Sequence, residues 1–419
     1  MSSAVAAPVM PMAPSATAFP DPPPPDTRVE RVLGRVRGAH AGPTLLCVGG
    51  LHGNEPAGVA ALDRVLKGLG PRAAGMRGDF VALAGNRTAL ALGRRYLDRD
   101  LNRAWTDERI RRLRGDGAAG ESAEDREQVE LLAAIEAVVE EARGPVYFLD
   151  LHTTSGPGGP FTTFGDTLPN RDLAAHIPVP MILGLEELVD GTLLAFLGQH
   201  GIVGVAYESG QHDEPRAEDR AEAGVWLAVA TVGLVEESLL PEAAAGRKLL
   251  AHDSGHLPRA MEMVYRHDIG PLDGFVMDPG YGNFSPVRAG QVVARDVRGP
   301  VAVGLDARLL MPLYQKQGND GFFLIREFSA FWLRASYILR SLGVDRWIHL
   351  LPGLSLDPAR PDTVVVNKGV ARWGALQFLH LLGFRKQEDQ GLRLVMRRRR
   401  FDDARYVVRG PRPERLSRG

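Results

Sequence analysis

Short apolar runs alternate with segments of helical spacing over the first 250 residues of the chain. Buried strands are predicted at 44–48, 80–84 and 146–149, and the apolar spacing of 59–69 predicts an amphipathic helix. Two more strands are predicted at 181–183 and 202–207. Because strands that alternate with helices build sheets covered on both faces, the pattern predicts an α/β fold with a mostly parallel or mixed sheet.

Two further helices are predicted from their ends and their spacing. Ser122 and Asp125 form a capping box, and the helix that they open should end before Gly144 and Pro145. The apolar segment 225–240 predicts the other helix.

The pattern changes beyond residue 250. Short alternating runs separated by turn residues predict a small β-rich domain, so we expect an α/β domain at 30–250 and a β-rich domain at 251–327 that caps its site. Residues 328–419 would form a C-terminal α/β extension, to which the sequence assigns no chemistry. Its basic run Arg397–Arg400 fits either contact with an acidic partner or an exposed strand on a solvated face.

Composition excludes several classes of protein. The chain has 419 residues, and its 50 basic and 51 acidic side chains leave a net charge of −1, which argues against a nucleic-acid-binding or membrane-surface protein. The sequence contains no apolar run long enough for a membrane-spanning helix. The proline- and alanine-rich residues 1–29 predict a disordered tail rather than a secretory signal. We therefore expect a cytoplasmic protein, whose oligomeric state the sequence does not predict.

The single cysteine narrows the choice of metal ligands. Cys47 can form neither an internal disulfide nor a paired-cysteine metal site, and its position within a predicted strand indicates a buried apolar residue. Any bound metal must therefore use histidine and carboxylate side chains.

Reactive side chains follow several of the predicted strands, at their carboxyl ends. His52 and Glu55 follow the first strand in a glycine-rich loop, His152 follows the third, and Glu208 follows the strand at 202–207. Because the carboxyl ends of parallel strands meet at one edge of a sheet, we expect these side chains to converge.

This set of side chains is suited to a catalytic zinc site. Such a zinc takes three nitrogen or oxygen ligands and keeps a position open for water, and His52, Glu55 and His152 supply the ligands for one ion per chain. Taken alone, a histidine three residues before a glutamate is more often a surface pair on a helix. Glu208 would remain to transfer protons, which predicts hydrolysis of an amide or ester.

Four segments in matching order carry a resemblance to a known family. They are Gly-Gly-Leu-His-Gly-Asn-Glu-Pro at 49–56, Arg-Arg-Tyr-Leu-Asp-Arg-Asp-Leu-Asn-Arg at 94–103, Asp-Leu-His-Thr-Thr at 150–154 and Glu-Ser-Gly at 208–210. Between about residues 40 and 327, the chain resembles the succinylglutamate desuccinylase/aspartoacylase family. These enzymes are relatives of the zinc carboxypeptidases and remove an acyl group from N-acyl amino acids.

The resemblance implies a role for each residue of the predicted centre. It assigns zinc to His52, Glu55 and His152, general acid/base catalysis to Glu208, and stabilisation of the oxyanion to Arg95.

Residues around this centre receive substrate-binding and supporting roles from the same resemblance. Asn102 and Arg103 would hold the substrate carboxylate, which suits the two-pronged donor geometry of a guanidinium. Asp100 would hydrogen-bond the far ring nitrogen of the first histidine, and Tyr314 would reach the site from the second domain. His212 either lines the cleft or is an ordinary loop histidine.

One departure from the family bears on the substrate. The aspartoacylase branch has a further substrate-binding arginine about ten residues before its catalytic glutamate, but this chain has no lysine or arginine between Arg171 and Arg216. A second substrate carboxylate would therefore lack its partner. The sequence predicts a zinc-dependent amidohydrolase acting on a small N-acyl amino acid, or a similar amide, with one carboxylate. The alternatives are a zinc carboxypeptidase acting on short peptides and a non-catalytic zinc-binding scaffold.

Overall fold

The computed structural model describes residues 29–115, 122–185, 188–358, 360–371 and 375–402. The predicted disordered tail at 1–29 therefore lies, except for its last residue, outside the described residues. No helix in the described part combines the length and apolar character that a membrane span requires.

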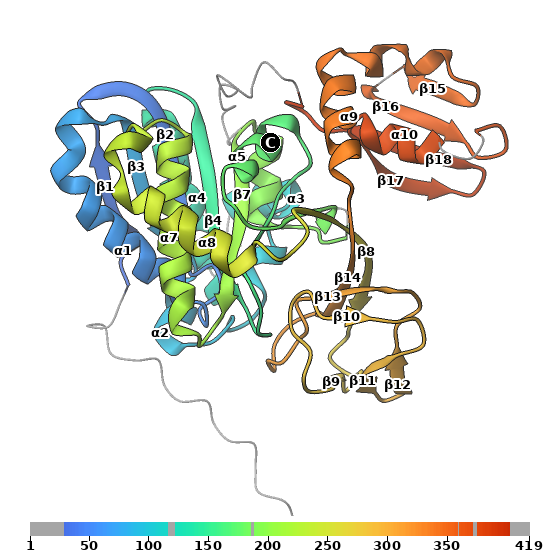
Figure 1. Cartoon of the computed structure of the whole chain (residues 1–419), viewed down its shortest axis with the longest axis horizontal. Helices are drawn as coiled ribbons and strands as arrows, with labels where there is room; N and C mark the ends of the chain where they lie inside the picture. Colours follow the sequence, from blue (N-terminus) through green and yellow to red (C-terminus); the bar gives the residue numbers. More distant parts are fainter. Residues whose placement is uncertain (1–28, 116–121, 186–187, 359, 372–374, 403–419) are drawn as a thin grey trace, which may run out of the picture.

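A large mixed sheet organises the described chain (Figure 1). Its eleven described strands follow the order β1-β3-β2-β4-β7-β5-β6-β8-β14-β13-β10, and its centre, β3-β2-β4-β7, is parallel. In chain order, the strands are β1 (Val32–Arg37), β2 (His40–Gly49), β3 (Arg77–Ala84), β4 (Val146–Thr154), β5 (Phe161–Thr163), β6 (Met181–Leu183), β7 (Val203–Gln211), β8 (Ala260–Asp268), β10 (Pro286–Val287), β13 (Ala307–Leu310) and β14 (Asp320–Glu327).

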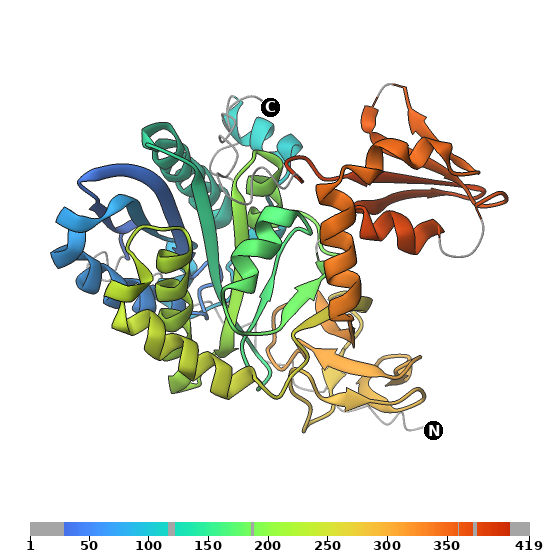
Figure 2. The same cartoon turned by 45° about the horizontal axis from the view of Figure 1, so that its top comes forward.

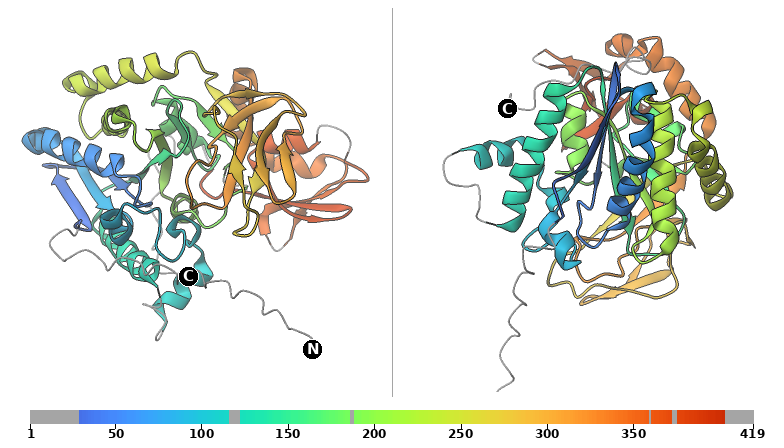
Figure 3. Two further views of the ribbon diagram at one scale, coloured as in Figure 1. Left: turned by 90° about the horizontal axis from the view of Figure 1, so that it is seen from below. Right: turned by 90° about the vertical axis from the view of Figure 1, so that its left-hand side faces the viewer.

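Helices cover both faces of this sheet, as the right-hand view of Figure 3 shows. The side chains of β2 alternate between two cores, because Leu45 and Cys47 face one and Leu46 and Val48 face the other. Helices α1 (Ala57–Leu69), α5 (Leu168–Ala175), α7 (Pro215–Thr231) and α8 (Pro241–Ser254) contribute to the first core. Helices α3 (Asp107–Arg114), α4 (Ala123–Glu141) and α6 (Leu193–Gln199) contribute to the second, and the short helix α2 (Arg87–Leu92) follows β3.

The predicted fold class is confirmed, with one helix misplaced. The side chain of Ser122 caps α4 by accepting a hydrogen bond from the backbone N–H of Asp125 at 3.1 Å, as predicted. The helix predicted at 225–240 instead begins at Pro215 and ends at Thr231. The first half of this helix is rich in charged side chains, so the apolar pattern did not indicate where it begins. Gly233, which has a positive φ of 78°, turns the chain after the helix ends.

Part of the β-rich segment continues the large sheet, and the rest forms a small sheet of its own. Strand β8 pairs in parallel with β6, and β14, β13 and β10 extend the same sheet beyond it. The remaining strands of the segment, β9 (Val276–Met277), β11 (Val292–Asp296) and β12 (Gly299–Ala302), form a three-stranded sheet at the bottom of Figure 1. Periodicity did not reveal this continuity because β6, the strand that joins the two parts, has only three residues.

The C-terminal extension has a core of its own and stands to one side of the sheet (Figure 2). It contains the helices α9 (Ala330–Ser341) and α10 (Ala375–Leu381) and the antiparallel strands β15 (Leu354–Asp357), β16 (Arg360–Asn367), β17 (Phe384–Gln390) and β18 (Arg393–Arg398). The basic run begins within β18, where the side chain of Arg397 is 44% exposed and lies 2.7 Å from Asp362. At Arg397, the basic run therefore lies on an exposed strand, which is the second of the two interpretations given above.

A buried ionic cluster joins the extension to the part of the chain that contains β5 and α5. Asp166, between β5 and α5, accepts hydrogen bonds from Arg171 at 2.9 Å and from Arg340 of α9 at 3.0 Å, and it also contacts Arg385 of β17. Burial opposes ionisation of this carboxyl, but the three guanidinium groups hold its pKa well below the usual value.

Candidate active site

The loop after β2 carries the first two predicted ligands into the protein interior. His52 and Glu55 are only 4% and 2% exposed. Two glycines allow this tight loop. Gly50 has a φ of 70°, and a Cβ on Gly53 would lie 2.0 Å from the carbonyl carbon of Ala89. The loop is therefore packed against the segment after β3 and holds both side chains in place.

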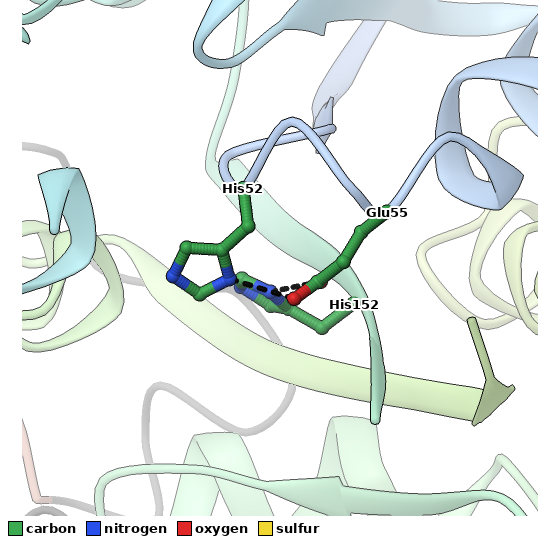
Figure 4. Close-up of side chains that lie close together, drawn as sticks. All are labelled: His52, Glu55 and His152. Carbon is green, nitrogen blue, oxygen red and sulfur yellow. Dashed lines mark hydrogen bonds and ion pairs between the residues drawn. The ribbon is translucent and has the colours of Figure 1, made fainter. Parts of the chain in front are cut away.

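His152, on β4, completes a compact group with these two residues (Figure 4). The Nδ1 atoms of His52 and His152 lie 2.8 and 2.9 Å from the two carboxylate oxygens of Glu55. One candidate ligand atom from each residue lies within 4.8 Å of the others. The group is buried and composed of two imidazoles and a carboxylate, a donor set that fits zinc.

A carboxylate stands behind each imidazole. The Nε2 atom of His52 lies 3.1 Å from Asp100, and the Nε2 atom of His152 lies 3.1 Å from Asp150. The contact of His52 with Asp100 is a hydrogen bond, of the kind by which outer carboxylates orient metal-binding histidines and raise their basicity, whereas Asp150 lies within ion-pair distance of His152 without a hydrogen bond among the described residues. Asp100 was predicted in this position, whereas Asp150 was missed. Asp150 could have been found from the sequence, because it lies two residues before His152 on the same strand, and residues two apart on a strand point to the same face.

Arg95 lies beside the same centre. Its Nη2 atom donates to Asp100 at 2.9 Å, and its Nη1 atom lies 3.6 Å from Glu55. Burial opposes ionisation of Asp100, but Arg95 and His52 hold the pKa of that carboxyl well below its usual range. The guanidinium is thus fixed at the edge of the cavity, close to the candidate metal ligands.

Glu208 lies on β7, directly opposite His152 of β4 in the parallel register. It is 9% exposed, and its Oε2 atom has no hydrogen-bond partner among the described residues. Burial raises the pKa of Glu208 to about 8, and the neighbouring Glu55 and Asp150 add to the increase while His152 and Arg95 oppose it. A carboxyl group with this pKa can both accept and release a proton near neutral pH.

The proposed carboxylate-binding residues also reach the cavity. Asn102 and Arg103 form the short 3-10 helix Leu101–Arg103, and both line the cavity. The Oδ1 atom of Asn102 accepts a hydrogen bond from the N–H of Leu193 at 3.0 Å, which leaves the amide nitrogen as the donor end. Arg103 donates to Asp320 at 2.8 Å, so this guanidinium already faces a carboxylate of the protein.

The structure does not bring Tyr314 to the cavity. Its hydroxyl group accepts the N–H of Tyr281 at 3.1 Å and lies 2.9 Å from the carbonyl oxygen of Asp278. Its neighbours Leu313 and Gln315 line the cavity instead. Tyr314 instead contacts the segment around Asp278 and Tyr281.

Gln315 and His212 form a polar wall that was only partly predicted. The Oε1 atom of Gln315 accepts from Asn54 at 2.7 Å and lies 3.1 Å from Nε2 of His212. The other ring nitrogen of His212 lies 2.7 Å from the hydroxyl of Thr153. His212 therefore lines the cleft, which is the first of the two interpretations given for it above. Burial lowers the pKa of its imidazole.

The cavity that these residues surround has a volume of about 130 Å³. Its polar end contains the His52, Glu55 and His152 cluster with Glu208. Polar and apolar side chains share the remaining wall, and the apolar ones are Phe164, Leu185, Val189, Leu194, Ala206, Met311, Leu313 and Phe323. Such a space suits a small molecule.

Comparisons with known proteins agree with this geometry. Residues 41–221 match the model of the succinylglutamate desuccinylase/aspartoacylase catalytic domain. A probable aspartoacylase of Prochlorococcus marinus is 36% identical over 140 residues, which cover 33% of this chain and 43% of that protein. A succinylglutamate desuccinylase of Pseudomonas fluorescens is 41% identical over 64 residues, which cover 15% of this chain and 19% of that protein. The matched regions thus span less than half the length of either relative.

A solved structure extends the likeness in fold. The succinylglutamate desuccinylase/aspartoacylase of Rhodobacter sphaeroides aligns with a TM-score of 0.50 at 18% identity, over 70% of this chain and 88% of that one. This match supports the fold, and the family model supports the catalytic domain. Residues 41–221 therefore resemble the catalytic domain of the succinylglutamate desuccinylase/aspartoacylase family.

Proposed function

We propose that the protein is a zinc-dependent deacylase that hydrolyses the amide bond of a small N-acyl amino acid bearing one carboxylate. The observation that carries the proposal is the buried group His52, Glu55 and His152, with the free Oε2 atom of Glu208 on the neighbouring strand. When bound, zinc supplies a Lewis acid that polarises a carbonyl group and activates water.

Glu208 is the proposed proton carrier. It takes a proton from the attacking water and passes it to the amine that leaves, and a pKa raised to about 8 by burial suits both steps. Arg95 donates hydrogen bonds to the oxygen on which negative charge develops, and its contacts with Asp100 hold it ready for this role. Both groups act from positions fixed before the substrate arrives.

Asn102 and Arg103 are the proposed anchor for the substrate carboxylate. An amide donor next to a guanidinium can bind one carboxylate with several hydrogen bonds. In the structure, Arg103 faces the carboxylate of Asp320. A substrate carboxylate therefore has to share this guanidinium with Asp320 or displace it.

Two alternatives are less well supported. A carboxypeptidase would need room for a peptide, whereas the cavity has a volume of about 130 Å³ and residues between 311 and 323 form part of its lining. A non-catalytic scaffold gives no account of Glu208, since a buried carboxylate next to candidate metal ligands is costly unless it is used.

A hydrolysis screen tests the proposed function. Purified protein loaded with zinc should release free amino acid from one or more N-acetyl amino acids, and dialysis against a chelator should abolish the release. Zinc added back should restore it. Absence of hydrolysis across the whole panel, or activity that is unchanged without metal, would contradict the proposal.

Replacing Arg103 with lysine should weaken recognition of the substrate carboxylate. Lysine keeps the charge but loses the two-pronged hydrogen bond, so we expect kcat/KM on an N-acyl amino acid to fall by about ten- to a hundredfold. The loss should nearly disappear on the corresponding N-acyl amino acid amide, which has no carboxylate.

Arg99, on the same segment but not part of the cavity wall, provides the matched control. Arg99→Lys should leave both substrates unaffected. Equal penalties for Arg103→Lys on the acid and the amide would rule out the carboxylate role.

A further inference from the structure

Three apolar side chains line the cavity from segments that adjoin the proposed carboxylate anchor, where Thr192, Asn319 and Asp320 also line it. The backbone around Gly191 packs against the anchor segment, where the N–H of Trp105 donates to the carbonyl oxygen of Gly191 at 2.9 Å. Val189, two residues before Gly191 in the same loop, lines the cavity. On the other side, β14 begins at Asp320, the partner of Arg103, and presents Phe323.

Leu313 completes this part of the wall. Its backbone N–H donates to the carbonyl oxygen of Gly321 at 2.9 Å, which ties it to the start of β14. Its side chain is half-buried and lines the cavity. Val189, Leu313 and Phe323 thus line the cavity from segments that adjoin Arg103 or its partner Asp320, and we refer to these three residues as the side-chain wall.

The charges of the cavity leave no place for a second anion. Among the described residues that line it, the lysine and arginine side chains are Arg95 and Arg103, and each already faces a carboxylate. Four carboxyl groups also line the cavity, and they are Glu55, Asp150, Glu208 and Asp320. A second carboxylate on the substrate would be buried without a cationic partner of its own.

The cavity is equally unsuited to a cationic side chain. Asp320 is the acidic group nearest to the anchor, but it accepts hydrogen bonds from both Arg103 at 2.8 Å and Arg266 at 2.5 Å. Two guanidinium groups therefore already neutralise this carboxylate, and a substrate ammonium would have to compete with both.

We infer that the amino-acid part of the substrate has an uncharged, apolar side chain, which packs against Val189, Leu313 and Phe323. This inference rests on the proposed deacylase function. In an N-acyl amino acid, the side chain and the carboxylate are attached to the same carbon atom, so the wall next to the carboxylate anchor is the one that the side chain meets. An apolar side chain gains from burial there, whereas a charged one loses its hydration.

The test compares substrates that differ only in the side chain. N-acetyl-leucine, N-acetyl-aspartate, N-acetyl-asparagine and N-acetyl-lysine share the acyl group and the carboxylate. We expect kcat/KM to be at least about a hundredfold higher on the leucine substrate than on the aspartate or lysine substrates, with asparagine between them. Equal or faster hydrolysis of the aspartate or the lysine substrate would overturn the inference.

A charge placed in the wall should shift this preference. Leu313→Arg supplies a cation where none is present, so the ratio of kcat/KM on N-acetyl-aspartate to that on N-acetyl-leucine should rise at least about tenfold. Leu313→Met, which is similar in size and uncharged, is the matched control and should leave the ratio nearly unchanged. Melting temperatures of both variants establish that they are folded. A folded Leu313→Arg variant with an unchanged ratio would count against the wall.

Binding measurements separate this inference from the proposed function. Calorimetric titration of the Glu208→Gln variant with the same four compounds measures recognition without hydrolysis. Tighter binding of N-acetyl-leucine supports the side-chain wall, even if the wild-type protein hydrolyses none of the four. Preferential binding of N-acetyl-aspartate or N-acetyl-lysine would refute the wall, even if deacylation is observed.

Discussion

Replacing Glu208 with glutamine is expected to lower kcat by about 10²- to 10⁴-fold, the usual contribution of a positioned general acid/base. The amide is nearly the same size as the carboxylate, so the fold and the metal content should persist. It cannot accept a proton from water, however, and no other described group stands in the same place, opposite His152 on β7. Steady-state kinetics on the best substrate of the screen, together with metal analysis of the variant, measure both expectations.

The matched control for this variant is Glu262→Gln. Glu262 lies on β8, is half-buried and has a pKa raised by burial, but it does not line the cavity. The control should keep nearly normal turnover. Near-normal hydrolysis by Glu208→Gln itself would show that another group transfers the proton.

The convergence of the site could be predicted because it depends on parallel strands. The apolar runs of β2, β4 and β7 were visible in the sequence, and their parallel order places the residues that follow them at one edge of the sheet. His52 and Glu55 could be identified because they follow a strand in a glycine-rich loop, whereas their spacing alone was not sufficient. The carboxylate of Asp150 could have been found by the same reasoning, since it lies two residues before His152 on one strand.

Contacts between distant segments could not be predicted in this way. Arg103 and Asp320 are 217 positions apart, and only the pairing of β14 with β8 brings the second residue to the cavity. The same holds for the contact of Asp166 with Arg340, 174 positions away, through which the C-terminal extension is attached. Periodicity describes one element at a time, so it carries no information on which strand edge receives the next segment.

Tyr314 illustrates a related limit of motif reasoning. The segment that carries it does reach the cavity, but the side chains that line it are those of Leu313 and Gln315. A motif gives the position of a segment, whereas the alternation of side chains along an extended chain decides which of them faces the site.

Replacing His152 with alanine should abolish stoichiometric metal binding and nearly all activity. Removal of one of three ligands leaves two donors, and the buried Glu55 then loses one of the two imidazoles that its oxygens contact. Elemental analysis should show close to one zinc per wild-type chain and a small fraction of this in the variant. Undiminished zinc in His152→Ala would reject the assignment of these ligands.

Two further variants turn this loss into a graded test. His252→Ala removes a histidine whose side chain is 80% exposed, so its zinc content should match that of the wild type. Asp150→Asn keeps all three ligands but weakens the carboxylate that lies 3.1 Å from the Nε2 atom of His152. Loss of such an outer carboxylate typically costs about 10- to 100-fold in metal affinity, so competition with a chelator should place Asp150→Asn between His252→Ala and His152→Ala.

Because the carboxylate of Asp150 acts only through the imidazole of His152, it should have no further effect on zinc affinity once His152 is absent. Asp150→Asn combined with His152→Ala should therefore bind zinc no more weakly than His152→Ala alone, and additive losses would show that Asp150 contacts the metal by another route.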